Sequence, residues 1–197
     1  MACDEGDFAE KSRGRPRRPE VDDRIRSAAS DLLRDGGPGA VTIDAVSNVS
    51  GVARTTIYRR FRSREEVLAT ILDEIVEEPF EPPDKSLEGQ LRWALERARI
   101  LLEEGLGRGG TAAVLADTDP EFTEALQQRL HTALATLREG IAAGATLGRL
   151  AAKVDPDALV GAVFGAYLAE VLQYGVPRPG WEDRTVALLL DGIAPPG

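Results

Sequence analysis

The side chains best suited to a chemical task lie in one short segment, residues 45–64. This segment contains no Asp or Glu, although the whole chain has a formal net charge of -9, and it carries the arginines Arg54, Arg59, Arg60, Arg62 and Arg64. Guanidinium groups bind phosphate, and they can also donate paired hydrogen bonds to guanine. Because acidic side chains would repel phosphates, their absence indicates a surface that contacts a polyanion such as DNA.

Charge is also divided along the rest of the chain. Residues 11–64 carry 13 Lys and Arg against six Asp and Glu, whereas residues 65–197 carry 11 against 23. This asymmetry favours two functional regions, a basic one that binds nucleic acid and an acidic one that nucleic acid would repel. The alternative is that surface charge is segregated by chance.

Residues suited to catalysis or metal binding are few. His131 is the only histidine and Cys3 the only cysteine, and no metal-ligand cluster, Cys–His pair or Gly-rich phosphate loop accompanies them. We therefore expect no metal, no cofactor and no enzymatic activity, while a Ser-His-Asp set stays open on sequence alone. The lone cysteine fits a reducing cytoplasm, and no apolar run is long enough to span a membrane, so we expect a cytoplasmic protein without a membrane partner.

Apolar residues recur at helical spacing through most of the chain, and no segment alternates convincingly as a strand does. We therefore predict an all-α fold. A polar arm over residues 1–19, rich in Arg, Gly and Pro, is expected to be disordered. A DNA-binding domain over residues 20–78 follows, and the Pro-rich stretch after it must stop any helix. Residues 84–197 then form a second helical domain.

The elements that would present the arginines form a helix-turn-helix over about residues 42–61. Thr42 can cap a short helix whose Val46 and Val49 face inward, and a Gly-containing turn follows. A second short helix then runs over about residues 53–60, with Ala53 and Ile57 on its inner face. In such a motif, the first residues of the second helix enter the DNA major groove. We predict that three residues contact base edges there: Arg54, Thr55 and Thr56.

The stretch AVTIDAVSNVSGVARTTIYRRFRSREEVLATIL resembles the DNA-binding signature of the tetracycline-repressor (TetR) family of bacterial regulators. The resemblance covers about residues 20–78 and includes the Gly51-Val52 turn and the pattern T-I-Y-x-x-F. It implies an N-terminal three-helix domain that binds DNA and a C-terminal helical bundle for ligand binding and dimerisation. It also implies phosphate contacts by Thr42, Tyr58 and Arg64. To these we add Arg59 and Arg60, the latter at a position where the family often has an aromatic residue or His.

The arm contains the sequence RGRPR, which resembles the core of an AT-hook. Arginines held in an extended backbone can enter the narrow minor groove of A·T-rich DNA, so Arg13, Arg15 and Arg17 are candidates for that contact. A loose basic tail that only strengthens non-specific binding is the alternative.

By the same resemblance, the acidic half should hold an effector pocket and a dimer interface. The candidate pocket residues, each of which could equally be ordinary core, are Trp93, Leu115, Phe122, Leu126, Phe164 and Tyr167. Helices that are apolar around most of their circumference must be buried, and a second subunit is the natural partner. The candidate interface residues are Gly161, Gly165, Leu168, Leu188 and Leu189.

The sequence thus predicts a homodimeric transcriptional regulator, most simply a repressor released from a palindromic operator on double-stranded DNA by a small apolar effector. A constitutive DNA-binding protein whose C-terminal half only dimerises is the second hypothesis. An enzyme built on the same helical scaffold is the third, and it lacks a catalytic constellation.

Overall fold

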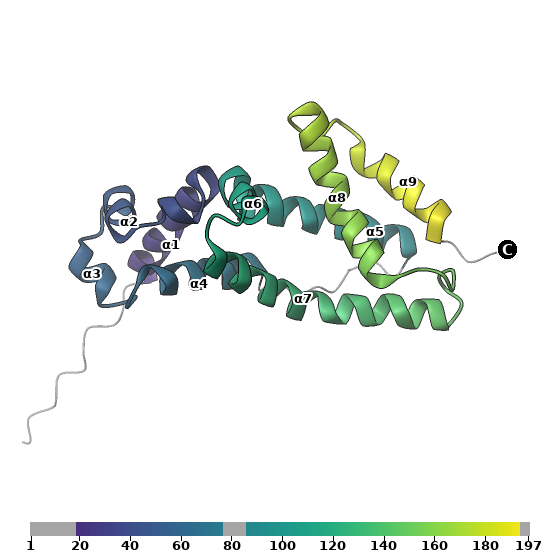
Figure 1. Cartoon of the computed structure of the whole chain (residues 1–197), viewed down its shortest axis with the longest axis horizontal. Coiled ribbons are helices and arrows are strands. Elements are labelled where there is room, and N and C mark those ends of the chain that lie inside the picture. The colour runs from purple at the N-terminus through teal and green to yellow at the C-terminus, as the bar shows by residue number, and fades with distance from the viewer. Residues whose placement is uncertain (1–18, 77–85, 194–197) are drawn as a thin grey trace, which may run out of the picture.

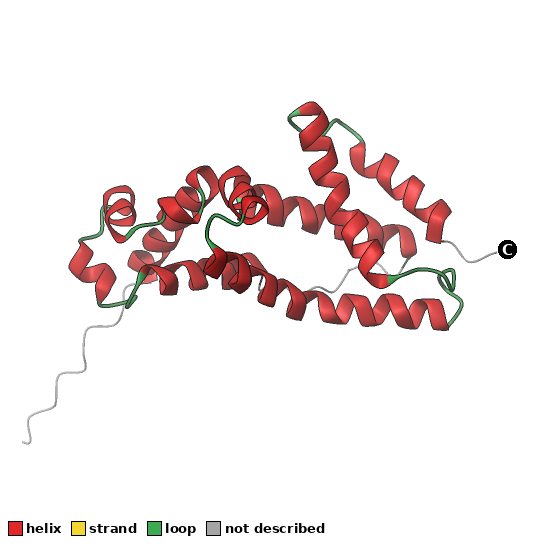
Figure 2. Cartoon of the chain, in the orientation of Figure 1, coloured by secondary structure: helices red, strands yellow, loops and turns green. Residues whose placement is uncertain are grey.

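The computed structural model describes residues 19–76 and 86–193, and all of its regular elements are helical. Figures 1 and 2 show an elongated arrangement in which the first four helices lie at one end and the last two at the other. The prediction of an all-α fold is therefore confirmed. Within the described ranges, no helix is both long and apolar enough to cross a membrane.

The N-terminal end is built from α1 (Pro19–Gly36), a 3-10 turn η1 (Pro38–Ala40), α2 (Ile43–Ser50), α3 (Arg54–Tyr58) and α4 (Arg64–Val76). As predicted, Thr42 caps α2, because its Oγ1 accepts a hydrogen bond of 3.1 Å from the Ala45 amide. Gly51 ends α2 in a left-handed conformation with φ of 67°, which glycine adopts without strain. These two signals fix the angle between α2 and α3.

Two inward-facing positions predicted for this domain are wrong. Val46 is fully buried, but Val49 is among the exposed large hydrophobic residues, because the buried face of α2 runs through Val46 and Ser50. Ala53 precedes α3 at its N-cap position and is also exposed. Ile57 is the residue that anchors α3 to the core, where it is fully buried.

The second half contains α5 (Leu87–Arg99), a π-helical turn η2 (Ile100–Gly105), α6 (Gly107–Ala116), α7 (Pro120–Thr146), α8 (Pro156–Tyr174) and α9 (Trp181–Ile193). Two Asp-Pro pairs start helices, α7 and α8. Asp119 accepts a hydrogen bond from the Phe122 amide at 3.1 Å, and Asp155 accepts one from the Ala158 amide at 2.7 Å.

The two halves of the chain are in close contact where the end of α1 packs against the start of α6, with backbone next to backbone. Gly107 has a φ of 62°, and a Cβ atom there would lie 2.5 Å from the Cα of Arg34. A Cβ atom on Gly109 would lie 2.4 Å from the Gly37 nitrogen. Any larger residue at these positions would push the helices apart, so the glycines allow the two backbones to touch.

The same segment also touches α4 and α8. A Cβ atom on Gly105 would lie 2.7 Å from the side chain of Ile75 in α4. The guanidinium of Arg108 donates a hydrogen bond of 3.1 Å to the Gly175 carbonyl, at the end of α8. We call residues 105–110 the glycine joint. Its glycines contact α1 and α4, and its Arg108 contacts the end of α8.

Candidate nucleic-acid interface and ligand cavity

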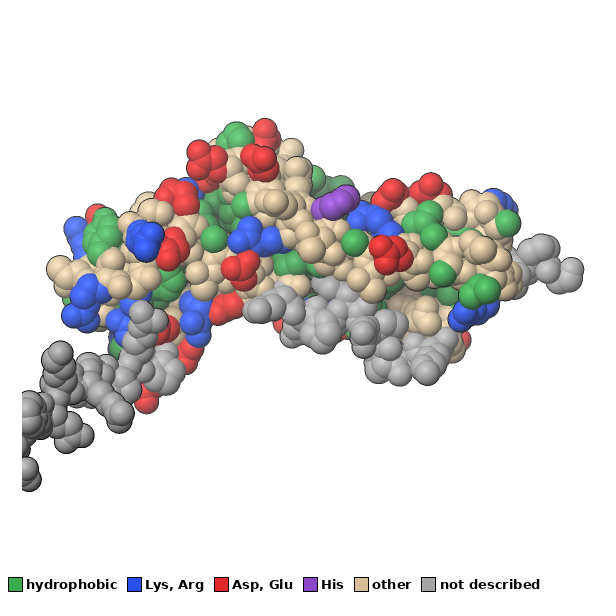
Figure 3. Space-filling view, turned by 90° about the horizontal axis from the view of Figure 1, so that it is seen from below, with side chains coloured by type: hydrophobic (Ala, Val, Ile, Leu, Met, Phe, Trp, Pro, Cys, Tyr) green, Lys and Arg blue, Asp and Glu red, His purple; other side chains and the backbone are tan. Residues whose placement is uncertain are grey.

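Helix α3 presents a polar outer surface at the end of the molecule. Arg54, Thr55, Tyr58 and Arg59 are exposed, and Thr56 is half-buried. Seen from below in Figure 3, Lys and Arg side chains gather at the end where α2 and α3 lie. The predicted base-contacting residues thus lie on one accessible helix, next to the exposed Thr42 that caps α2.

An acidic neighbour of this surface was missed by the sequence reasoning. Asp44, one residue before the acid-free segment, lies in α2, and its carboxylate forms an ion pair with the Nε of Arg54 at 2.8 Å. Both side chains are exposed, so the pair contributes less than about 1 kcal/mol to stability. The pair places the Arg54 side chain beside α2.

Two of the arginines predicted to contact phosphate are instead occupied within the protein. The Arg60 side chain is only 15% exposed and is ion-paired with Asp22 of α1. Arg60 therefore ties the end of α3 to α1. Because its guanidinium is directed toward α1, the predicted phosphate contact is not supported.

Arg64 is similarly engaged, with a side chain that is 26% exposed. It donates hydrogen bonds to the carbonyls of Val41 at 3.0 Å and Pro38 at 2.7 Å, and to the carboxylate of Asp119 at 2.7 Å. Arg64 thus joins the start of α4 to the loop before α2 and to the first turn of α7. A phosphate contact would require it to give up these partners.

Asp119 has two roles at this junction. One carboxylate oxygen caps α7 and the other accepts from Arg64. The hydrogen bond from Arg64 lowers the pKa of Asp119, and the Phe122 amide lowers it further, against the opposing effect of burial. The carboxylate is therefore held ionised at the boundary between the DNA-binding helices and the rest.

The predicted minor-groove residues Arg13, Arg15 and Arg17 lie outside the described residues.

A cavity of about 480 Å³ lies between α5, α7 and α8. This volume is within the range of small-molecule sites. Most of the lining is apolar, including Leu91, Leu101, Leu137 and Val163, and the polar side chains among the lining residues come from Gln90, Arg97, Thr136 and Arg149, with the Trp93 indole as a further donor. The cavity can therefore enclose an apolar body and offer a few polar contacts.

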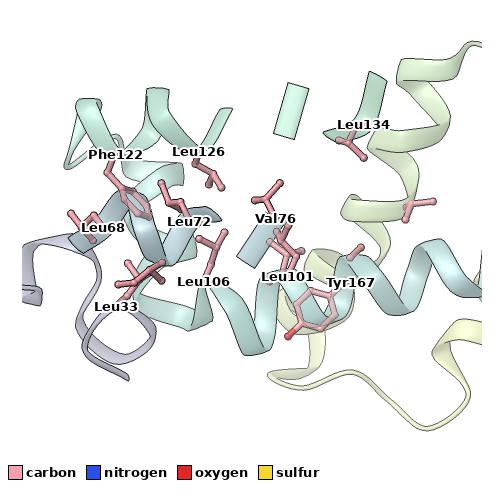
Figure 4. Packing of buried hydrophobic residues seen from close by; sticks show 14 of the residues in the cluster. Leu33, Leu68, Leu72, Val76, Leu101, Leu106, Phe122, Leu126, Leu134 and Tyr167 are labelled. Atoms are coloured by element: carbon pink, nitrogen blue, oxygen red, sulfur yellow. The ribbon is translucent and has the colours of Figure 1, made fainter. Parts of the chain in front are cut away.

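Only two of the predicted pocket residues, Trp93 and Phe164, line this cavity. Leu115 is 73% exposed on the outside of α6. Phe122 and Leu126 are buried in the core, and Figure 4 shows them beside Leu68 and Leu72 of α4. Tyr167 is buried with its ring edge-on to Trp181, at a centroid distance of 6.0 Å. Phe122, Leu126 and Tyr167 thus fit the alternative of ordinary core, whereas the exposed Leu115 fits neither the pocket nor the core.

The sequence reasoning missed the two arginines of the cavity. Arg97 lies three residues after Ala94, a member of the apolar stripe of α5, so helical spacing places it on the face that meets the cavity. That spacing could have identified it. Arg149 is in the turn between α7 and α8, where no periodicity applies.

The candidate interface residues lie on α8 and α9 and differ in exposure. Gly161 and Gly165 are exposed, and among the described residues no heavy atom lies within 4 Å of where their Cβ atoms would be. Leu188 is 72% exposed, whereas Leu168 and Leu189 are half-buried. Leu172, which was not predicted, is 84% exposed and shares the helical face of the two glycines.

Comparisons with known proteins identify relatives of the chain. The family model described as bacterial regulatory proteins, tetR family, matches residues 25–71. Over 168 residues the chain is 30% identical to the uncharacterized HTH-type transcriptional regulator YdeS of Bacillus subtilis, a match that covers 79% of this chain and 82% of YdeS. Over 65 residues it is 38% identical to the HTH-type transcriptional regulator EthR of Mycobacterium tuberculosis, which covers 32% of this chain and 30% of EthR. The fold is similar to that of Salmonella enterica GusR, with a TM-score of 0.67 at 18% identity over 88% of this chain and 94% of that one.

Proposed function

Because the chain belongs to the tetR family of bacterial transcriptional regulators, we propose that it is a cytoplasmic homodimeric repressor which a small effector releases from a palindromic operator. The curated relatives are HTH-type transcriptional regulators and not enzymes, in line with the expectation for this chain.

In this proposal, the exposed residues of α3 read the operator. Arg54 donates a pair of hydrogen bonds to a guanine, and Thr55 and Thr56 contact neighbouring base edges. Thr42, Tyr58 and Arg59 bind phosphates and set the register of the helix in the major groove. Asp44 releases Arg54 when guanine O6 and N7 replace its carboxylate. Arg60 and Arg64 act inside the protein, where they hold α3 and α4 in place.

One observation supports the effector part of the proposal. A single continuous segment, residues 101–110, lines the cavity at its start and contacts α1 and α4 further on. Leu101 lines the cavity and lies in the π-helical turn, and the glycine joint begins four residues later. At the joint, Gly107 and Gly109 meet α1, and Gly105 meets α4. A ligand that displaces the π-helical turn therefore displaces the helices that carry α3.

To release the operator, the ligand needs only to bind the arrangement that cannot bind DNA more tightly than the arrangement that can. A coupling free energy of about 1–3 kcal/mol between the two sites corresponds to roughly a 5–150-fold loss of operator affinity. Two recognition helices of a dimer must fit one duplex about one helical turn apart, so a small change in their separation is sufficient.

The test is operator binding by fluorescence anisotropy with the full chain and DNA from upstream of its own gene. We expect saturable binding at one pseudo-palindrome, two protein chains per site, and weaker binding when a ligand of the cavity is added. Binding that no cavity ligand alters would favour the constitutive DNA-binding protein. Absence of any specific binding would contradict both hypotheses.

A further inference from the structure

We infer that the cavity between α5, α7 and α8 takes an amphipathic anion, an apolar body that carries a carboxylate or phosphate group, and that Arg97 and Arg149 neutralise its charge. This inference rests on the proposed function, since it names the class of effector.

The charge of the lining carries the argument. Among the described residues that line the cavity, Arg97 and Arg149 are the ionised side chains, and none is Asp or Glu. Residues 65–197 contain about two acids for each base, 23 against 11. A lining with two bases and no acid therefore departs from its surroundings. A cationic ligand would meet repulsion there, whereas an anionic ligand would meet two opposite charges.

The placement of the two arginines strengthens the argument. Arg97 is half-buried on α5, with Ala94 and Ala98 of the same helix and Leu101 of the π-helical turn also lining the cavity. Charge–charge attraction is stronger in such an apolar setting than in water. Arg149 is exposed, and its amide donates to the Gly144 carbonyl at 2.9 Å, which fixes the backbone where α7 ends. One arginine thus lies within an apolar wall and the other on the accessible side of the cavity.

The rest of the lining defines the body of the ligand. From Leu87 to Ala98 the lining follows α5 over about 17 Å, given a rise of 1.5 Å per residue. The opposite walls are formed by α7 and α8, with Leu134, Ile141 and Phe164 among their contacts. An elongated hydrocarbon chain fits this shape better than a compact polar metabolite, and each buried methylene adds to its affinity.

The experiment compares head groups on one chain length with the full-length protein. Isothermal titration at pH 8 is carried out with decanoate, decyl phosphate, 1-decanol and decylamine, each below its micelle concentration. We expect both anions to bind at least about tenfold more tightly than the alcohol, as one charge-assisted contact allows, and the amine to bind most weakly. The ratio of decanoate to decyl phosphate affinity tells which anion the site prefers.

Three variants assign the effect to residues. Arg97→Gln and Arg149→Gln should each reduce the preference for the anion over the alcohol by several-fold and leave affinity for the alcohol nearly unchanged. Arg92→Gln removes the same charge from α5 at an exposed position that does not line the cavity, and it should preserve the preference. Circular dichroism confirms that each variant is folded.

The outcomes separate the inference from the proposed function. If the alcohol binds the unaltered protein as tightly as the anions, or if both cavity variants keep the full preference, the inference is overturned while an effector of another class still fits the proposal. If none of the four probes binds and a neutral apolar ligand instead releases the operator, the inference again fails alone. If neither the four probes nor the neutral ligand binds the protein or releases the operator, both the inference and the effector part of the proposed function are overturned.

Discussion

The arginines of residues 45–64 differ in what they can bind, because some are exposed to solvent and others are engaged within the protein. Arg54 is exposed and has one exposed carboxylate as its partner, so DNA can replace that partner at little cost. Arg60 and Arg64 are mostly buried and bound to groups of other helices. Substituting either would leave a carboxylate without its counter-charge, so a loss of DNA binding there would report a structural defect.

We predict that Arg54→Ala weakens operator binding by about 1–3 kcal/mol, since a bidentate contact with guanine is lost. Arg54→Lys keeps the positive charge but cannot donate the paired hydrogen bonds of a guanidinium, so its operator affinity should lie between those of Arg54→Ala and the unaltered protein. Fluorescence anisotropy on the operator and on a scrambled duplex measures both. Equal losses on the two duplexes would show that Arg54 binds phosphate and reads no base.

Glu170 provides a second residue-scale prediction. Hydrogen bonds from the Arg178 guanidinium and amide lower its pKa to about 2, from an ordinary value of 4.5. Because the folded-state pKa is depressed, the ion pair stabilises the end of α8 above pH 4.5, and this stability is lost as the pH falls toward 2.

NMR titration of the Glu170 side chain checks that value. In Arg178→Gln the pKa of Glu170 should rise toward 4.5, and the thermal midpoint should depend less on pH between 4.5 and 2. Glu182, whose pKa is raised by burial, serves as the internal control, because the charges that act on it come from Glu96, Arg99 and Arg92 and not from Arg178. Its pKa should not move. An unchanged Glu170 pKa in the variant would contradict the assignment.

How much of the site follows from sequence depends on whether its residues belong to a periodic element. The exposure of Thr55 and Tyr58 follows from the helix-turn-helix pattern, and two of the predicted pocket residues, Trp93 and Phe164, line the cavity. Phe122 and Leu126 do not line it, because a buried aromatic residue or Leu has the same sequence pattern whether it faces a cavity or another helix. Packing across elements decides between the two.

At the scale of elements, helix starts were predictable and the joint between helices was not. Thr42, Asp119 and Asp155 cap helices as their local sequence indicates. The close contact between α1 and α6 depends on residues about 70 positions apart, so no local pattern reveals it. The sequence GLGRGG would ordinarily indicate a loop, yet most of it begins a helix.

The glycine joint is sensitive to a single added carbon. Gly109→Ala places a Cβ atom against the backbone of residues 35–37, so we expect the free energy of unfolding to fall by about 1–3 kcal/mol, as in overpacked cores. Gly192→Ala, in α9 with open space around its Cβ position, should instead stabilise by up to about 1 kcal/mol. Urea unfolding measures both, and equal effects in the two variants would contradict a tight joint.

At the scale of the whole molecule, the DNA-binding surface and the candidate dimer surface lie at opposite ends (Figure 1). Helix α8 is apolar around much of its circumference, yet Gly161, Gly165 and Leu172 are left uncovered on one face. Two-fold association through this face would relate two copies of α3 by the same axis, as the two half-sites of a palindrome require.

We predict that Leu172→Glu combined with Leu188→Glu converts the dimer to a monomer, because four buried carboxylates would meet at the interface. Both positions are exposed in the single chain, so its fold should persist. Light scattering after size exclusion at micromolar concentration measures the mass. Val49→Glu, an exposed apolar residue at the other end of the molecule, should leave the dimer intact. A double variant that remains dimeric would place the interface elsewhere.

The shielded contact between Arg64 and Asp119 has a consequence for behaviour in salt. Phosphate contacts release counterions, so operator affinity should fall steeply as ionic strength rises. The Arg64–Asp119 pair connects the two halves of the chain and is mostly shielded from solvent, where dissolved ions screen it far less. The contact between the two halves of the chain should therefore persist at ionic strengths that already weaken operator binding.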